Sequence, residues 1–371
     1  MVITFPQMGN ISLAAKSFFE ELKIPCVVPE NNKRALQTGA LLSPDEMCLP
    51  FKIMMGNYIA SIARGADTIL ITGSCGPCRF GEYCELQMKI LARQGLHADL
   101  IVVDAPREIG VKTLMQRLGR IGDASPLSTG KQLTALRRAV IVLKAADGID
   151  AEAHMRAGYE AEHGACKRLL DECRREVLAC RGISDALAVL DQYHARLHRV
   201  PVDAKRQPIK VALVGEIYSM IEPFSNMYIE EKLMDYGVCS SRLITPSWWL
   251  KDLVMKPLRL NSRSLHAASQ PYLPYGVGGH AQETIAHAEL SARRGFDGAI
   301  QIFPVGCMPE IVANAVLPEV QRRNDFPILN LVMDEITGEA GYVTRIEAFL
   351  DMLEARRNKG GRREEKLQLG Y

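Results

Sequence analysis

The sequence predicts an α/β protein with two similar Rossmann-like parallel-sheet domains and a helical insertion between them. Residues 1–106 alternate short apolar runs with helical patterns, and residues 208–355 repeat this alternation. The intervening residues 107–207 are almost wholly helical in pattern. Strands and helices that alternate at this spacing are typical of βαβ units and a parallel sheet.

The first domain begins with a strand-like run, VITFP, which is followed by the helical segment ISLAAKSFFEELK and a second strand in CVVPE. A helix in IMMGNYIASIARG leads into the strand TILIT, and a helix in YCELQMKILARQG leads into DLIVVD. These strands are almost continuous apolar runs, which indicates that both faces of the sheet are covered. The loop after TILIT is rich in cysteine.

The middle region is rich in charge and has apolar helical faces in LKAADGIDAEAHMRAGYEAE and CKRLLDECRREVLA. The second domain opens with KVALVGEIY and continues through further strand and helix patterns to EAGYVTRIEAFLDML. Residues 356–371 are charged and contain glycine, so we expect a frayed, charged tail there.

The two α/β parts are similar to one another in sequence. The segment ARGADTILITGSC ends at Cys75 and corresponds to ARRGFDGAIQIFPVGC, which ends 232 residues later at Cys307. A second pair, Asp104 and Asp334, has an offset of 230 residues. Ligands of open α/β sheets bind beyond the carboxyl ends of the strands, so two facing halves would bring Cys75 and Cys307 together. The alternative is that any two βα units share such a pattern.

The composition narrows the class of protein. Lysine and arginine number 45 against 43 acidic residues, so nothing favours nucleic acid or an anionic membrane as a partner. No window approaches the length of a transmembrane helix, and the start MVITFPQMGN predicts a strand and turn instead of a signal peptide. We therefore expect a cytoplasmic protein, whose ten cysteines are ligands, redox groups or buried thiols and not a disulfide framework.

Five cysteines follow predicted strands or lie in loops, and these are the candidate metal ligands: Cys48, Cys75, Cys78, Cys84 and Cys307. Loops rich in glycine and proline can wrap a soft metal, and a tetrahedral sulfur site indicates zinc or an iron–sulfur cluster. Cys75-Gly-Pro-Cys78 alone also fits a redox dithiol, whereas a zinc ribbon would need a second such pair. An iron–sulfur cluster accepts this irregular spacing, so we predict that these cysteines hold a metal.

Other polar residues give weaker signals. Cys166, Cys173 and Cys180 recur every seven residues on one helical face, about 10 Å apart, which favours packing over metal binding. The eight histidines show no spacing that we recognise as that of metal ligands, and no nucleotide-binding loop is present. Glu216 follows an apolar strand and Asn226 lies at a helix start, so each is either a site residue or a helix cap.

Five segments carry a resemblance to a known family: DEMCLPFKIMMGN, GSCGPCRFGEYCELQ, VGEIYSMIEPFSN, FPVGCMPE and MDEITGEAGYVTRIEAFLD. Together they resemble the 2-hydroxyacyl-CoA dehydratase superfamily. The resemblance is greatest to its uncharacterised, activase-associated branch, which is related to double-cubane cluster proteins. The resemblance covers both α/β parts. It implies an iron–sulfur cluster held between two similar domains. It also implies an ATP-hydrolysing activase as the electron donor, and an acyl-CoA thioester or another substrate that is hard to reduce.

By position, the resemblance assigns ligand roles to Cys48, Cys75 and Cys307, with Cys84 or Cys78 completing the set. The second half offers only Cys239 in addition to Cys307, so a single [4Fe-4S] cluster is favoured over a double-cubane [8Fe-9S] cluster. In an enzyme of the dehydratase or reductase type, Glu216 and Asn226 are the candidates for the pocket wall.

The sequence leaves two other functions open. One is a non-catalytic iron–sulfur electron-transfer or scaffold subunit. The other is a protein in which zinc has a purely structural role. A related subunit or a second copy of the chain is a further expected partner.

Overall fold

The computed structural model confirms the predicted fold class and describes residues 1–73, 83–103, 110–255 and 263–368. Its two sheets are four-stranded and wholly parallel, with the orders β2-β1-β3-β4 and β6-β5-β7-β8. The first sheet consists of β1 (Ile3–Thr4), β2 (Cys26–Val27), β3 (Thr68–Thr72) and β4 (Asp99–Val103). The second consists of β5 (Lys210–Gly215), β6 (Cys239–Arg242), β7 (Gly298–Pro304) and β8 (Ile328–Met333).

Helices connect these strands, as the sequence pattern predicts. The first domain contains α1 (Asn10–Glu21), α2 (Lys33–Leu42), α3 (Leu49–Ala63) and α4 (Tyr83–Arg93). The insertion contains α6 (Val111–Ala124), α7 (Thr129–Ala157), α8 (Ala165–Ala179) and α9 (Ile183–His198). The second domain contains α10 (Ile217–Ile221), α11 (Ile229–Asp235), α12 (Pro246–Met255), α13 (Arg263–Ser269), α14 (Ala281–Arg293), α15 (Met308–Asn324) and α16 (Glu339–Gln368).

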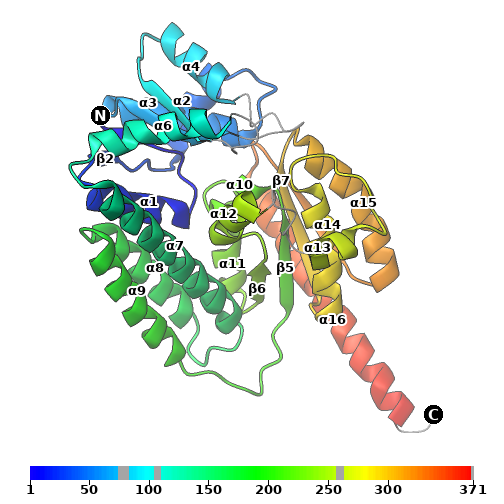
Figure 1. Cartoon of the computed structure of the whole chain (residues 1–371). Coiled ribbons are helices and arrows are strands. Elements are labelled where there is room, and N and C mark those ends of the chain that lie inside the picture. Colours follow the sequence, from blue (N-terminus) through cyan, green and yellow to red (C-terminus); the bar gives the residue numbers. More distant parts are fainter. Residues whose placement is uncertain (74–82, 104–109, 256–262, 369–371) are drawn as a thin grey trace.

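Helices cover both faces of each sheet, which explains the apolar strand sequences. On β3, Ile69 and Ile71 face the core under α3 and α4, while Leu70 contacts the core formed with α1 and the insertion. The first of these cores continues without a break into the second domain, where it includes Ile300 and Ile302 of β7. Figure 1 shows the first domain at the top, α7, α8 and α9 at the lower left and the second sheet to their right.

The strand ends of the two sheets are equivalent, in agreement with the repeat seen in the sequence. Thr72 pairs with Val103 at the ends of β3 and β4, and Pro304 pairs with Met333 at the ends of β7 and β8. The next amide repeats the same hydrogen bond in both halves: Gly73 N to Val103 O and Val305 N to Met333 O, each 2.9 Å. Thr72 and Pro304 are separated by the same 232 residues as Cys75 and Cys307.

A buried network of charged side chains joins the three parts of the chain. The guanidinium of Arg242 contacts Asp150 Oδ2 of α7 at 3.1 Å and Glu230 Oε2 of α11 at 2.7 Å. Asn10, the first residue of α1, donates to the same Asp150 oxygen at 2.8 Å. Arg174 of α8 lies 3.4 Å from Asp150 Oδ1. One buried carboxylate therefore has partners from both domains and from the insertion itself.

The turn after β1 packs directly on the second domain. Gly9 has φ of +52°, and an added Cβ would lie 2.2 Å from the backbone oxygen of Ile221. Its amide donates to Glu222 Oε2 at 2.9 Å. This close approach requires glycine, because any side chain would clash with backbone and strain the turn.

The carboxyl end of the chain differs from the sequence prediction. Instead of a frayed tail, α16 continues to Gln368 and extends away from the rest of the molecule at the lower right of Figure 1. Of the helices in the described residues, none combines the length and the apolar character needed to cross a membrane.

We predict that Arg242→Met destabilises the fold by about 3–5 kcal/mol, because Asp150 and Glu230 would stay buried without their cation. The measurement is the free energy of unfolding from urea denaturation. As a control, Arg356→Met removes the exposed pair with Asp325 and should cost less than about 1 kcal/mol. Equal effects of the two substitutions would show that the network does not hold the domains together.

Candidate metal centre

Two of the predicted ligand cysteines occupy the same kind of position, the N-cap of a helix. Cys48 precedes α3 and Cys307 precedes α15, and each is followed by proline within the first helical turn. Neither thiol caps its own helix by a side-chain hydrogen bond. A helix N-terminus stabilises negative charge through its exposed N–H groups and dipole. The fold thus presents both sulfurs where a thiolate, and an anionic group bound to it, is favoured.

Cys84 lies at the start of α4, next in sequence to a residue that contacts Cys48. The Cys48 thiol contacts the hydroxyl of Tyr83, which is the residue before Cys84. The ring of Tyr83 packs edge-on against Phe51 of α3, with 5.0 Å between the ring centroids. Both thiols are half-buried. Packing of α3 against α4 therefore connects the Cys48 turn to the start of the helix that carries Cys84, whereas Cys75 and Cys78 lie outside the described residues.

An ion pair joins the Cys48 helix to the second domain. Lys52, one turn after Cys48, places its Nζ 2.5 Å from Glu335 Oε1, and its side chain is only 4% exposed. Glu335 follows β8, and β8 is the neighbour of β7, which leads into Cys307. The helix that carries Cys48 and the strand ends beside Cys307 therefore meet across the junction of the two domains.

The described thiols do not form a compact site for one ion. A zinc ion with thiolates at about 2.3 Å needs sulfurs within about 4 Å of one another. Among the described residues, no group formed by Cys48, Cys84 and Cys307 has all its ligand atoms within 4.8 Å. As they are placed, the described thiols do not by themselves form a three-thiolate site for one zinc ion.

Two buried hydroxyls lie near the same junction. Within the described part of the chain, the hydroxyl of Tyr58 on α3 has no hydrogen-bond partner, although the residue is 1% exposed. The fully buried hydroxyl of Tyr218 on α10 lies close to it and has the side chain of Asn31 as its neighbour. Burial raises the pKa of both, and the nearby Cys84 thiol adds to the shift of Tyr58. An unsatisfied buried hydroxyl is costly. The presence of these two hydroxyls on facing elements near Cys84 fits a junction built around a polar ligand.

His280 occupies in the second domain the place that Cys48 has in the first. It is the N-cap of α14, the helix before β7, as Cys48 is the N-cap of α3, the helix before β3. Gly279, with φ of +55°, packs against Pro309, and an added Cβ would lie 2.6 Å from that ring. This contact brings the starts of α14 and α15 together, so His280 lies next to the Cys307 turn.

Glu310 is a site residue that the sequence reasoning missed. It lies in the first turn of α15, is 1% exposed, and accepts hydrogen bonds of 2.9 Å from both Thr284 and Gln301. Burial raises the pKa of Glu310 to about 8, the two hydrogen bonds oppose this shift, and the nearby Glu216 adds to it. In the sequence, the acidic residue that directly follows Cys-Met-Pro could have indicated Glu310 as a candidate. At neutral pH the group carries a proton.

Glu216 and Asn226 both act as caps. The Glu216 carboxylate accepts from the amides of Tyr218 and Ser219 at 2.8 and 2.9 Å, and burial raises its pKa against these bonds. The Asn226 amide donates to Ser219 O at 2.7 Å and accepts from Ile229 N at 3.2 Å. The structure therefore shows the capping alternative for both residues, and their polar atoms are engaged within their own loops.

Three further cysteines, Cys166, Cys173 and Cys239, lie away from the candidate metal centre. Cys166 and Cys173 are buried in the core of the insertion, as predicted, and burial raises the pKa of each to about 12. Cys239 is buried at the first residue of β6, the opposite end of the sheet from the Cys307 turn. Cys239 cannot therefore serve as a ligand beside Cys307.

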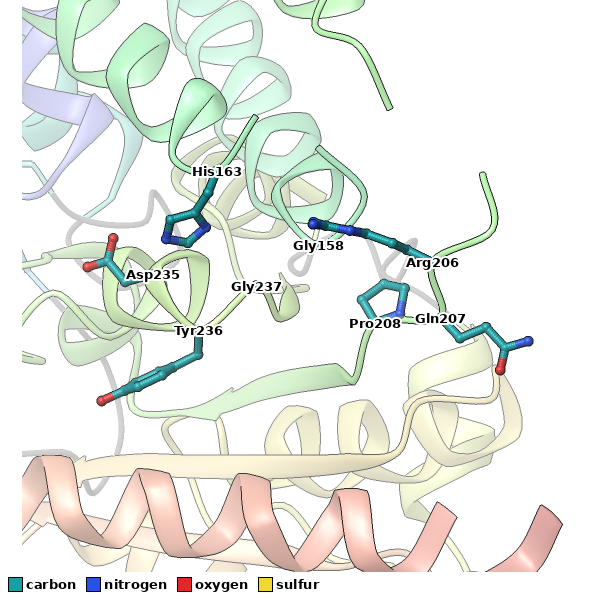
Figure 2. A pocket seen from close by; sticks show the side chains of 8 residues that line it. All are labelled: Gly158, His163, Arg206, Gln207, Pro208, Asp235, Tyr236 and Gly237. Atoms are coloured by element: carbon teal, nitrogen blue, oxygen red, sulfur yellow. The ribbon is translucent and has the colours of Figure 1, made fainter. Parts of the chain in front are cut away.

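A hollow of about 400 Å³ opens elsewhere, between the insertion and the second domain. Figure 2 shows His163 and Asp235 on one side of it and Arg206 and Gln207 on the other. None of the predicted site residues lines it. It is a polar surface depression at the connection into β5.

No protein-family model matches the chain, and none of the curated proteins searched matches it either. The residues themselves thus carry the functional inference.

We predict that Glu310→Gln removes a pH dependence of stability. Folded Glu310 keeps its proton up to about pH 8, while the unfolded carboxyl loses it near its ordinary pKa of 4.5. The wild-type protein therefore loses up to about 1.4 kcal/mol per pH unit as the pH rises through this interval. Glutamine mimics the protonated group, so the variant should match wild type near pH 5 and exceed it at pH 9 in urea denaturation.

The control is Glu319→Gln on the exposed face of α15, where Arg322 and Arg323 lower the pKa of Glu319 to about 2. This variant should show no such gain at alkaline pH. A parallel decline of Glu310→Gln and wild type between pH 5 and 9 would contradict a proton on Glu310.

Proposed function

We propose that the protein is a cytoplasmic [4Fe-4S] protein that accepts low-potential electrons from an ATP-dependent activase for a reductase- or dehydratase-type reaction. The observation that carries the proposal is the presentation of Cys48 and Cys307 at the N-termini of helices from two halves of identical topology. Tyr83, the residue before Cys84, contacts Cys48, and the strand that leads to Cys75 ends like the strand that leads to Cys307. The sequence resemblance to the 2-hydroxyacyl-CoA dehydratase superfamily supports the same assignment.

The cluster would be held by Cys48, Cys75, Cys307 and either Cys84 or Cys78. When bound, it supplies one-electron transfer. The N-termini of α3 and α15 would offset the negative charge of the thiolates. Lys52, buried one turn from Cys48, contributes a positive charge whose partner Glu335 comes from the other domain. Glu310, three residues after Cys307, holds a proton at neutral pH within a buried site.

Exposed apolar side chains surround the Cys307 turn, which fits the docking of a partner protein there. Val305 is 52% exposed, Ile311 51% and Ile336 84%. An exposed apolar surface beside a buried redox group gives a partner a contact area close to the group that receives the electron. This supports the activase as the partner of this face.

The second candidate function is a non-catalytic electron-transfer or scaffold subunit. The capping roles of Glu216 and Asn226 favour it, because the polar atoms of these two predicted pocket residues are hydrogen-bonded to backbone groups. Structural zinc is the third alternative. The described thiols are too far apart for one zinc ion to be held by Cys48, Cys84 and Cys307 as they are placed.

We predict about four iron atoms and four acid-labile sulfides per chain in anaerobically purified protein, with the broad visible absorption of a cubane. Cys48→Ser and Cys307→Ser should each lose most of this iron and sulfide, because each removes a ligand from a different half. Cys173→Ala is the matched control: it removes a thiol buried in the insertion and should keep the full content. Zinc without sulfide, or equal loss in all three variants, would contradict the proposal.

We further predict that acyl-CoA changes the EPR spectrum of the reduced protein if the reaction is of the dehydratase type. A substrate that takes the place of the fourth thiolate at the cluster would alter its electronic environment. The control is CoA without its acyl group. An unchanged spectrum, together with full iron and sulfide content, would favour the non-catalytic electron carrier and contradict direct binding of substrate to the cluster.

A further inference from the structure

Three side chains on the surface of the helical insertion converge on one point. His194 and His198 lie one turn apart on α9, and Glu152 faces them from α7. Their ligand atoms all lie within 4.8 Å of one another, and no other such group of three histidine, cysteine or acidic residues occurs in the described part of the chain. The group is independent of the cysteines and of the function proposed for them.

Two of the distances within the group are close to those of ligands around one ion. His194 Nε2 lies 3.2 Å from His198 Nε2 and 3.5 Å from Glu152 Oε2. Ligands bound at 2.0–2.1 Å in a tetrahedron are about 3.3 Å apart. His198 Nδ1 lies 3.1 Å from Glu152 Oε1, so this ring turns different nitrogens toward its two partners. An imidazole binds one ion through one nitrogen, so the His198 ring must rotate for all three residues to bind one ion.

We propose that His194, His198 and Glu152 form a binding site for a divalent transition-metal ion of the zinc type. Two imidazoles and one carboxylate are ligands that Zn²⁺ accepts readily, and water would complete the coordination. The two histidine side chains are each 54% exposed, so an ion can reach them from solvent.

Hydrogen bonds hold the three side chains together when no ion is bound. The two ring nitrogens 3.2 Å apart form one of them, and His198 Nδ1 lies 3.1 Å from Glu152 Oε1. Arg156 lies 3.3 Å from Glu152 Oε1 and donates to the backbone oxygen of His198 at 2.9 Å, which holds α9 against α7. The two helices are therefore already fixed at the distance that a shared ion needs.

Binding there would link two helices of the insertion. Glu152 lies on the same helix as Asp150, whose carboxylate joins the insertion to both α/β domains. Fixing α7 to α9 would therefore stabilise the element that carries this junction. His194 and His198 are four residues apart in the sequence, but this spacing alone did not indicate a metal site, because the third ligand is 42 residues earlier and only the fold brings it near.

The test is Zn²⁺ titration of the anaerobically purified full-length protein near pH 7.5, followed by calorimetry. The comparison includes wild type, His194→Ala, His198→Ala and the control His97→Ala. Any Zn²⁺ bound by thiols is common to all four proteins, so differences between them report on the histidines. His97 is exposed on the loop between α4 and β4. We expect wild type and His97→Ala to bind one Zn²⁺ whose affinity falls at least about tenfold in either ligand variant.

A second measurement separates this site from other zinc sites. Anomalous scattering at the zinc edge, from crystals soaked in Zn²⁺, should place an ion between α7 and α9 in wild type and not in His194→Ala. Equal stoichiometry and affinity in all four proteins, or the absence of an anomalous peak between these helices, would overturn the proposal.

Discussion

The carboxylate of Asp150 lies in the interior of the molecule and has partners from every part of the chain. Asn10 comes from the first domain, Arg174 from the insertion and Arg242 from the second domain. Removing two arginines and their carboxylates from water is expensive, and good geometry together with further hydrogen bonds must offset the cost. Such a network stabilises only one arrangement of the three parts. The relative position of the two sheets therefore depends on it.

With the sheets fixed, their carboxyl-terminal edges can build one site from two halves. The turn at Gly9 contacts Ile221 and Glu222, and the Lys52–Glu335 pair connects α3 to the end of β8. Each contact joins a segment beyond a strand end in one domain to its counterpart region in the other. Ligands of parallel sheets bind at such edges. Cys48 and Cys307 thus lie where the fold is most constrained between the domains.

The fold class could be predicted from the sequence because strands buried on both faces leave continuous apolar runs, and because the repeat at Cys75 and Cys307 marks equivalent strand ends. The hydrogen-bond partners of the polar side chains could not be predicted from the sequence. A carboxylate before a helix, such as Glu216, suits both a cap and an active site, and only the positions of the Tyr218 and Ser219 amides show that it caps. The proton on Glu310 likewise depends on burial, which comes from tertiary packing.

The two halves share a topology but differ in chemistry. At the N-cap before the third strand, the first domain has Cys48 and the second has His280. After the third strand of the second domain, Cys307 is followed by Glu310, a buried acid that keeps its proton at neutral pH. The first half therefore contributes mainly sulfur, and the second contributes one sulfur together with groups that bind protons. Under the function that we propose, the first half would supply ligands for a redox centre and the second half a proton donor, which are the two groups that the one-electron reduction of a substrate needs.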